Sequence, residues 1–261
     1  MPRFHVGRDY VSSVVNEKRS MNMFSKITMV VAALFIAMSG AWAHALWIKT
    51  EATGKKGRKQ VVAVLYSEPD EDPEKLADWY SDMKDFELWV VSPEGKKTKL
   101  TTTAGEDRFT AEFTPEQDGV YTVFAGKSAK DLGGTTVYQF NASALVAVGS
   151  ARKGADAGVN GNELVVFADP LKVNKVNTPM QLQTLVNGQK PADKLYVSVH
   201  SPSGWSKRIA TDENGVAEFT PLWPGNYSIE VSKSWKEAGT HYDKEYKAIW
   251  RCATIIAEVK K

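Results

Sequence analysis

The chain has 261 residues, 43% of them hydrophobic, and a formal net charge of +2 at pH 7. A chain of this length and composition can form one or two globular units. The residues before Ala43 carry five basic and two acidic side chains, so the rest of the chain is close to neutral. A near-neutral chain without clustered Lys and Arg excludes nucleic acid and an anionic membrane surface as expected partners.

The first 43 residues have the pattern of a leader and a secretory signal peptide. Lys26 precedes an apolar run, and Ala41-Trp42-Ala43 supplies the small residues expected at a cleavage site. Residues 1–20 are polar and patternless, and a start at a later methionine would make them dispensable. The alternative is an uncleaved membrane anchor, because the apolar stretch approaches the roughly 20 residues that span a bilayer. With cleavage, we expect a periplasmic protein that is not stably inserted in the membrane.

From residue 44 onward, short β-rich runs alternate with turn residues, and no sustained helical period occurs. One short helix is expected over Asp72–Met83, where Asp72-Pro73-Glu74 has the order of a helix start. The pattern therefore predicts an all-β fold. The expected strands are residues 60–66, 86–91, 97–102, 108–113, 120–124, 135–148, 163–167, 180–185, 195–200, 207–209, 216–219, 227–231 and 247–259.

An internal repeat divides this β-rich region into two similar halves. Ser92-Pro93-Glu94-Gly95 corresponds to Ser201-Pro202-Ser203-Gly204, and Phe113-Thr114-Pro115 corresponds to Phe219-Thr220-Pro221. Residues 150–161 are rich in Gly, Ala and Asn, which is typical of a linker. The repeat predicts two tandem immunoglobulin-like β-sandwich domains, residues 44–149 and 162–261, after a cleaved signal peptide at residues 1–43.

A tyrosine follows the second block in each half, two residues after a glycine. These residues are Tyr121 and Tyr227. Each ring is expected to be buried, with its hydroxyl bonded to backbone, as in the tyrosine corner of immunoglobulin-like sandwiches. Cys252 is the only cysteine, so an intramolecular disulfide is excluded, and its apolar surroundings favour a small buried core residue over a reactive thiol.

The start of the exported part and the turns of the second half resemble a known family. Ala43-His44-Ala45-Leu46-Trp47 is similar to the Ala-His-x-x-Trp mature start of domain-of-unknown-function family 4198, and residues 179–259 resemble the carboxy-terminal sandwich of that family. The similar turn motifs are Leu185–Pro191, Thr211–Val216 and Pro224–Tyr227. Members of the family are associated with nickel or cobalt uptake. The resemblance therefore implies a periplasmic β-sandwich protein that handles a transition metal.

Cleavage after Ala43 would make His44 the first residue, so that its α-amine and imidazole could chelate one ion. Nitrogen donors suit transition metals such as copper and nickel. His200 and His241 complete the candidate ligand set for a nickel, cobalt or copper ion. Each histidine also has a structural alternative, as a residue beside a cleavage site, at a strand rim or in a loop. The hypothesis is an accessory protein that passes the ion to, or senses it for, a metal-uptake transporter or another envelope protein.

Other features leave alternatives open. The acidic run 67–74 could hold a hard cation such as calcium or form a solvated loop. Trp205, Trp223 and Trp235 could stack on a sugar or peptide, or could pack in the core and cover turns. No nucleophile elbow, zinc-protease helix or phosphate loop occurs, so we do not expect an enzyme. The alternative functions are a non-enzymatic envelope module that binds protein or glycan, and a structural spacer.

Overall fold

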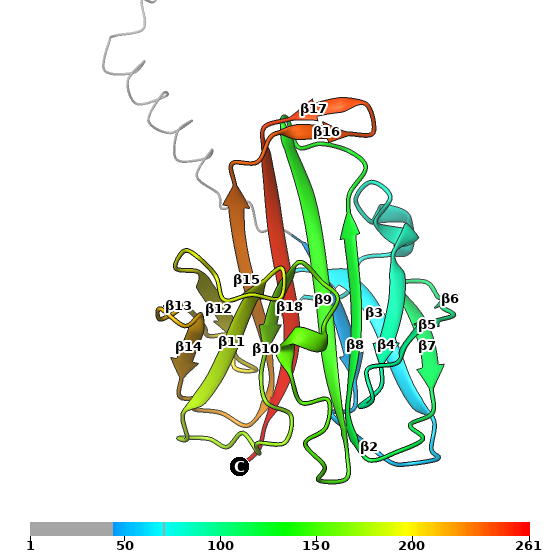
Figure 1. Cartoon of the computed structure of the whole chain (residues 1–261), viewed down its shortest axis with the longest axis vertical. Coiled ribbons are helices and arrows are strands. Elements are labelled where there is room, and N and C mark those ends of the chain that lie inside the picture. The colour runs from blue at the N-terminus through cyan, green and yellow to red at the C-terminus, as the bar shows by residue number, and fades with distance from the viewer. Residues whose placement is uncertain (1–43, 70) are drawn as a thin grey trace, which may run out of the picture. The chain divides into compact units, whose positions relative to one another are not determined.

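The computed structural model describes residues 44–69 and 71–261. The predicted leader and signal peptide, residues 1–43, lie outside these residues. The described chain is all-β, as the sequence predicts, and contains no α-helix (Figure 1). Within the same residues, no helix is long and apolar enough to span a membrane.

The strands of each half follow the predicted runs closely, and several short strands are added to them. The first half contains β1 (Ala45–Thr50), β2 (Thr53–Gly54), β3 (Gln60–Ser67), β4 (Glu87–Val91), β5 (Lys97–Leu100), β6 (Thr103–Ala104), β7 (Arg108–Phe113), β8 (Gly119–Ser128) and β9 (Thr136–Val148). The second half contains β10 (Leu164–Phe167), β11 (Met180–Val186), β12 (Tyr196–His200), β13 (Ser206–Ala210), β14 (Val216–Phe219), β15 (Gly225–Trp235), β16 (Gly239–His241), β17 (Lys244–Tyr246) and β18 (Ala248–Val259).

Each half encloses its own hydrophobic core between two layers of strands. In the first half, the sheet β1-β3-β7-β6 packs over β8, β9 and β4, with Val64, Val123 and Phe140 among the core residues. In the second half, the sheet β10-β11-β14 packs over β12, β15 and β18, with Leu182 and Ile229 in the core. Apolar residues at every second position of a strand place one face of the strand inward, which is why the alternating runs form these layers.

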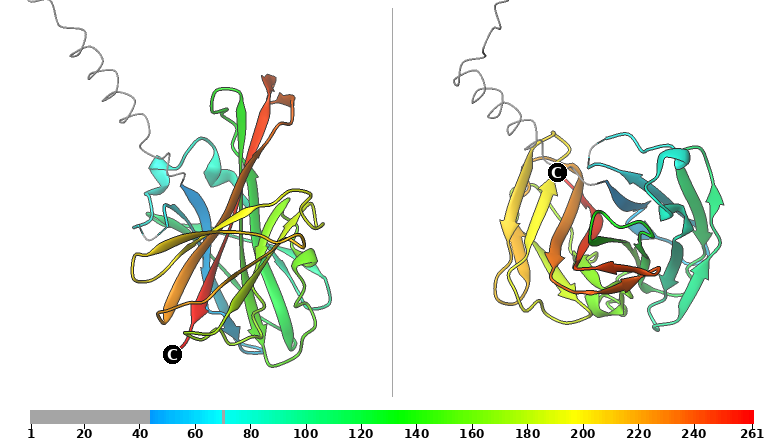
Figure 2. Two further views of the ribbon diagram at one scale, coloured as in Figure 1. Left: turned by 90° about the vertical axis from the view of Figure 1, so that its left-hand side faces the viewer. Right: turned by 90° about the horizontal axis from the view of Figure 1, so that it is seen from above.

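One sheet runs through both halves, and the sequence did not predict this connection. The strand order of this sheet is β13-β12-β15-β18-β9-β8-β4-β5, with β18 and β9 paired in parallel (Figure 1). Seen from above, the two halves lie side by side (Figure 2). Cys252 lies beside Phe140 in the pairing, and the side chain of Asn141 donates a hydrogen bond to the Cys252 carbonyl at 2.9 Å. Because neighbouring residues of a strand point to opposite faces, Phe140 faces the first core, whereas Ala253 faces the second. The two cores therefore lie on opposite faces of a shared sheet.

The predicted tyrosine corner is confirmed in both halves. Tyr121 is 5% exposed, and its hydroxyl accepts from the backbone N–H of Glu116 and donates to the carbonyl of Gln117 at 3.2 Å. Tyr227 is 1% exposed, and its hydroxyl accepts from the backbone N–H of Trp223 and donates to the carbonyl of the same residue at 3.0 Å. The two halves thus share the same turn geometry at this position.

The predicted helix over Asp72–Met83 is wrong. Only two short 3₁₀ turns form there, η1 (Leu76–Asp78) and η2 (Met83–Asp85). The backbone N–H of Glu74 bonds to Tyr66 of β3, so the start of the segment is held by a strand rather than by helical hydrogen bonds. Ser81 has φ of 51°, a left-handed conformation that interrupts a right-handed helix. Tertiary contacts therefore override the local helix signal.

Cys252 is a buried core residue, as predicted. It is 1% exposed and packs with Ala45, Trp47 and Leu65, on the outer side of β1 and β3. Burial raises the pKa of its thiol well above the usual value. β1 is therefore covered on both sides, by the first core on one side and by β18 of the second half on the other.

Candidate functional site

His44 stands immediately before β1 and lies between two carboxylates of the acidic run. Its Nε2 is 3.0 Å from Glu74 Oε1, and its Nδ1 is 3.9 Å from Glu68 Oε1. The imidazole stacks on Tyr66, with ring centroids 5.5 Å apart. Tyr66 and Glu68 come from the end of β3 and from the residues just after it, and β1 pairs with β3, so the sheet itself positions the histidine beside them.

The acidic run is partly withdrawn from solvent. The Glu68 side chain is 10% exposed, and burial raises the pKa of this carboxyl, with the negative charges of Glu71 and Glu74 adding to the effect and His44 opposing it. The interpretation of the run as a solvated loop is therefore wrong for Glu68. Negative charge gathers around one imidazole, which is an arrangement that favours a cation.

A second carboxyl near Glu68, that of Glu230, is partly buried, and the sequence did not predict it as part of the site. Burial raises the pKa of Glu230 on β15, while hydrogen bonds from Ser232 and Cys252 oppose the shift. The negative charge of Glu68 acts on the pKa of Glu230 in the same direction as burial. The only signal in the sequence is the polar residue at every second position of β15, at Ser228, Glu230 and Ser232.

A groove of about 660 Å³ lies beside this cluster. Trp47 of β1, Glu68 and Glu71 line one part of it, and Ser228 of β15 and Ile256 of β18 line another. The groove therefore connects the acidic run with the outer face of the second half.

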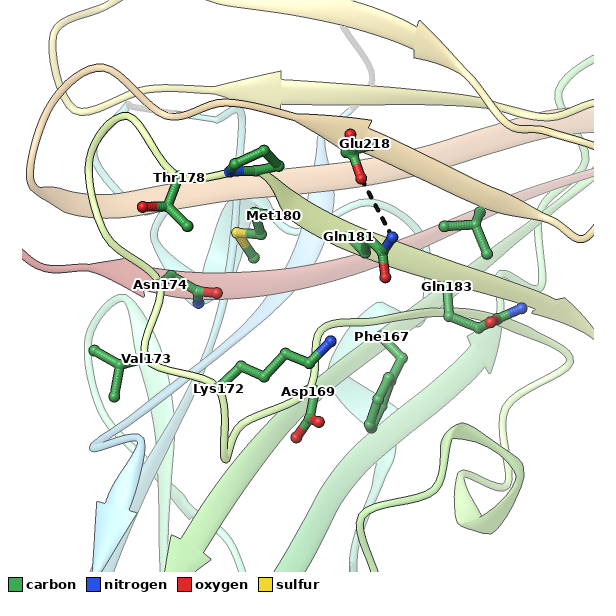
Figure 3. A pocket seen from close by; sticks show the side chains of 12 residues that line it. Phe167, Asp169, Lys172, Val173, Asn174, Thr178, Met180, Gln181, Gln183 and Glu218 are labelled. Carbon is green, nitrogen blue, oxygen red and sulfur yellow. Dashed lines mark hydrogen bonds between the residues drawn. The ribbon is translucent and has the colours of Figure 1, made fainter.

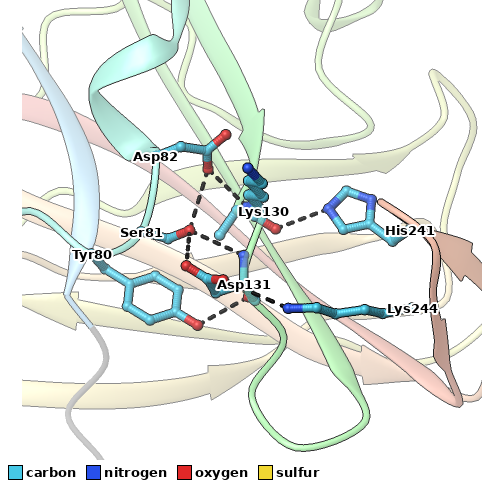
Figure 4. Close-up of polar contacts among 8 residues, drawn as sticks. Tyr80, Ser81, Asp82, Lys130, Asp131, His241 and Lys244 are labelled. Carbon is cyan, nitrogen blue, oxygen red and sulfur yellow. Dashed lines mark hydrogen bonds and ion pairs between the residues drawn. The ribbon is translucent and has the colours of Figure 1, made fainter.

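His200 and His241 occupy other surroundings than His44. His200 is opposite Ser206 on one side and Ser228 on the other, so it shares a sheet face with a residue of the groove. His241 lies on β16, and its Nε2 donates to the carbonyl of Ala129 at 2.9 Å (Figure 4). Among residues 44–69 and 71–261, no three His, Cys, Asp or Glu side chains form a group that could hold a metal ion. The structure thus does not gather the three predicted histidines into one ligand group.

A family model decides the classification of this chain. The model described as Domain of unknown function (DUF4198) matches residues 41–234. The chain belongs to the DUF4198 family. No curated protein matches the sequence of this DUF4198 protein.

Solved structures similar to the DUF4198 protein include three with low identity. They are a DUF4785 family protein from Legionella pneumophila subsp. pneumophila str. Philadelphia 1, a tetra-tandem repeat in the extending region of a large adhesion protein, and Salmonella alpha-2-macroglobulin reacted with methylamine. In that order, the identities are 12%, 14% and 10%, the TM-scores are 0.29, 0.25 and 0.25, and 77%, 84% and 83% of this chain is covered. The chain spans 53%, 50% and 15% of their respective lengths.

Near His241, hydrogen bonds and an ion pair hold residues 80–82 to the turn that follows β8. Figure 4 shows residues 80–82 joined to the turn that follows β8. Asp82 accepts from the backbone N–H of Lys130 and pairs with Lys127 Nζ, both at 2.7 Å, and Ser81 Oγ donates to Asp131 at 2.9 Å. Burial acts to raise the pKa of Asp82, but the hydrogen bonds and charge of Lys127 together with the Lys130 N–H lower it overall.

Replacing Asp82 by Asn should lower the free energy of unfolding of the DUF4198 protein by about 1–2 kcal/mol at pH 7, because a charge-assisted bond is lost. The pKa of Asp82 is depressed in the folded state. Its contribution is therefore present above the unfolded pKa of about 3.9 and is lost as the pH falls through the folded value. Urea unfolding of the wild type and Asp82→Asn at several pH values measures the difference, which should shrink on acidification. Asp78→Asn, at an exposed site on the same segment, is the matched control and should change stability by less than about 0.5 kcal/mol.

A second pocket of the DUF4198 protein, of about 640 Å³, is separate from the His44 site. It lies against β11 and β14 and the segment after β10, and its lining includes Phe167, Lys172, Gln181 and Gln183 (Figure 3). Gln181 donates to Glu218 at 3.2 Å. Amide, ammonium and aromatic groups of this kind suit a polar organic ligand, and no histidine or cysteine lines the pocket.

Proposed function

We propose that this DUF4198 protein is an exported, periplasmic accessory protein that binds a transition-metal ion, namely nickel, cobalt or copper, for uptake or sensing. Its ligands would be the α-amine and imidazole of His44, released by cleavage after Ala43, together with the carboxylate of Glu68. The expected partner is a metal-uptake transporter or another envelope protein.

The observation that carries the proposal is the pair of carboxylates around the His44 ring. A carboxylate 3.0 Å from Nε2 favours the proton on that nitrogen, which leaves Nδ1 as the donor atom. Ligating histidines in metal sites usually donate their other ring N–H to a carboxylate or carbonyl, so Glu74 supports the ring in the way that metal sites require. Nδ1 then faces Glu68 Oε1 across 3.9 Å, whereas two donors on one tetrahedral ion lie about 3.3 Å apart, so a shift of roughly half an ångström would bring both atoms onto one ion.

The α-amine of His44 would supply the third donor that a transition-metal site needs, because the nearby side chains supply only two. A tight transition-metal site needs three or more donors, and the described side chains offer only the His44 imidazole and Glu68 in suitable positions. The α-amine of a first residue lies next to its own imidazole, so one residue supplies two nitrogen donors. Glu71 and Glu74 add negative charge nearby, which further favours a divalent ion.

Calorimetric titration of protein that starts at His44 with nickel, cobalt and copper tests the proposal. The matched variant starts at Ala43, so that the amine moves one residue away from the imidazole, and its affinity should fall at least about tenfold, or 1.4 kcal/mol. Glu74→Gln should weaken binding by about 10- to 100-fold, because it removes the support of the ring. Glu112→Gln, at an exposed carboxylate on β7 that pairs with Lys59, is the control and should bind as the wild type does. Equal affinities for the His44 and Ala43 starts would refute the proposal.

The second candidate function is a non-enzymatic envelope module that binds protein or glycan. The exposed Trp205 and Trp223 favour it, since both are about two-fifths exposed. Binding through this surface would persist in the presence of a metal chelator, whereas metal binding at His44 would not.

A further inference from the structure

At one end of its sandwich, each half contains the same two neighbouring turns, a Ser-Pro turn and a tyrosine-corner turn. In the first half, the Ser92 N–H bonds to the Lys96 carbonyl at 2.9 Å, and in the second the Ser201 N–H bonds to the Trp205 carbonyl at 2.8 Å. Gly119 and Gly225 follow the two tyrosine-corner turns with φ of 133° and 132°. The proline of each Ser-Pro turn lies against the corresponding glycine, so close that an added Cβ would contact it. The repeat therefore allows this end of the first half to be compared with the equivalent end of the second half.

The chain itself covers this end of the first half. The Lys153 carbonyl accepts from the Val120 N–H at 2.8 Å, Lys153 Nζ forms an ion pair with Glu94, and Gly154 packs against Pro93. Pro93 is buried and Val120 is 1% exposed as a result. The covering segment is itself a turn, closed by a hydrogen bond from the Ala155 N–H to the Arg152 carbonyl, with Gly154 at φ 80°.

The same end of the second half is open. Pro202 and Asn226, which correspond to Pro93 and Val120, are both exposed. Trp205, Leu222 and Trp223 stand around them with exposures of 40%, 53% and 38%, and we call these three residues the tryptophan patch. The rings of Trp205 and Trp223 lie 6.3 Å apart at 51° to one another.

The fold does not require apolar residues in the tryptophan patch. At the corresponding positions, the first half forms the same turns with polar residues. The corresponding residues are Lys96 for Trp205, Glu116 for Leu222 and Gln117 for Trp223. Exposed aromatic residues that folding does not need are typical of binding surfaces, where tryptophan often contributes most of the affinity.

We propose that the tryptophan patch binds an apolar polypeptide loop of a partner protein, which covers the open end of the second half as the turn at residues 153–154 covers the first. A polypeptide occupies the equivalent place within this molecule. The patch itself carries no charge, so the segment should present an uncharged apolar side chain between the two tilted rings.

A triple variant that carries the corresponding first-half residues in place of the tryptophan patch tests the proposal. Protein from residue 44 and a Trp205→Lys, Leu222→Glu, Trp223→Gln variant are each panned against a display library of random 12-residue peptides. Enriched peptides are then measured by fluorescence anisotropy in the presence of a metal chelator. We expect apolar peptides that bind the wild type and bind the triple variant at least about tenfold more weakly. Thermal unfolding of the variant should match the wild type within a few degrees, and Trp223→Gln alone serves if the triple variant is unstable.

Three results would overturn the proposal. Peptides that bind both proteins equally, or no enriched peptide at all, would show that the patch does not bind polypeptide. Concentration-dependent dimers that disappear in the triple variant would assign the patch to a second copy of this chain. Binding of glycans, but not peptides, to the wild type on an array would assign it to sugar. None of these results depends on His44 or Glu68, so failure here is distinguishable from failure of the metal proposal.

Discussion

Replacing Trp47 by alanine is expected to lower the free energy of unfolding by about 3–5 kcal/mol. Trp47 is 2% exposed, and its indole N–H donates to the carbonyl of Ser67 at 3.1 Å. It packs with Leu65 and Cys252, so it joins β1 and β3 of the first half to β18 of the second. Its removal would leave a large cavity between the halves and a buried carbonyl without its donor.

Urea unfolding monitored by circular dichroism measures the loss for Trp47→Ala. Trp47→Phe should cost less, because the ring volume is largely retained and only the hydrogen bond is lost. Trp89→Ala is the control, since Trp89 is half-buried under Lys97 on the outer side of β4, and it should be milder than Trp47→Ala. A loss below about 1 kcal/mol for Trp47→Ala would contradict the proposed role of this residue as the link between the halves.

The second half alone, residues 162–261, is expected to unfold at least about 10 °C below the chain from residue 44 and to self-associate. Without β9, the twelve-residue strand β18 becomes an open edge, which is a template for pairing with another molecule. Cys252 and Thr254 also lose their cover, because Thr254 donates a hydrogen bond to Leu46 of the first half. Each newly exposed large side chain costs about 1.5–3 kcal/mol, and each kcal/mol lowers the unfolding temperature of a domain of this size by about 4–8 °C.

Calorimetry and sedimentation of the second half and of the chain from residue 44 compare the two proteins under identical conditions. A monomeric second half with the unfolding temperature of the longer chain would show that the modules are independent, as the repeat alone suggests. A single cooperative transition in the longer chain would support the shared sheet.

The amino-acid sequence by itself determined the repeat, the tyrosine corners and most of the strands from residue 60 onward, but not β1. These features depend on local chemistry, since alternating apolar residues select a strand face and Ser-Pro-x-Gly selects a turn. The buried state of Cys252 followed in the same way from its apolar strand. The helix prediction over Asp72–Met83 failed because the hydrogen bond of Glu74 to β3 and the left-handed backbone at Ser81 outweigh a local helix start.

Only the tertiary structure decided how the halves combine and what surrounds the candidate site. The parallel pairing of β9 and β18 joins residues more than a hundred positions apart, and no local pattern specifies such a partner. The same holds for the site, where the pairing of β1 with β3 places His44 between Glu68 and Glu74. Strand pairing between distant segments depends on the packing of whole faces, so a sequence pattern indicates which residues form strands but not which strands meet.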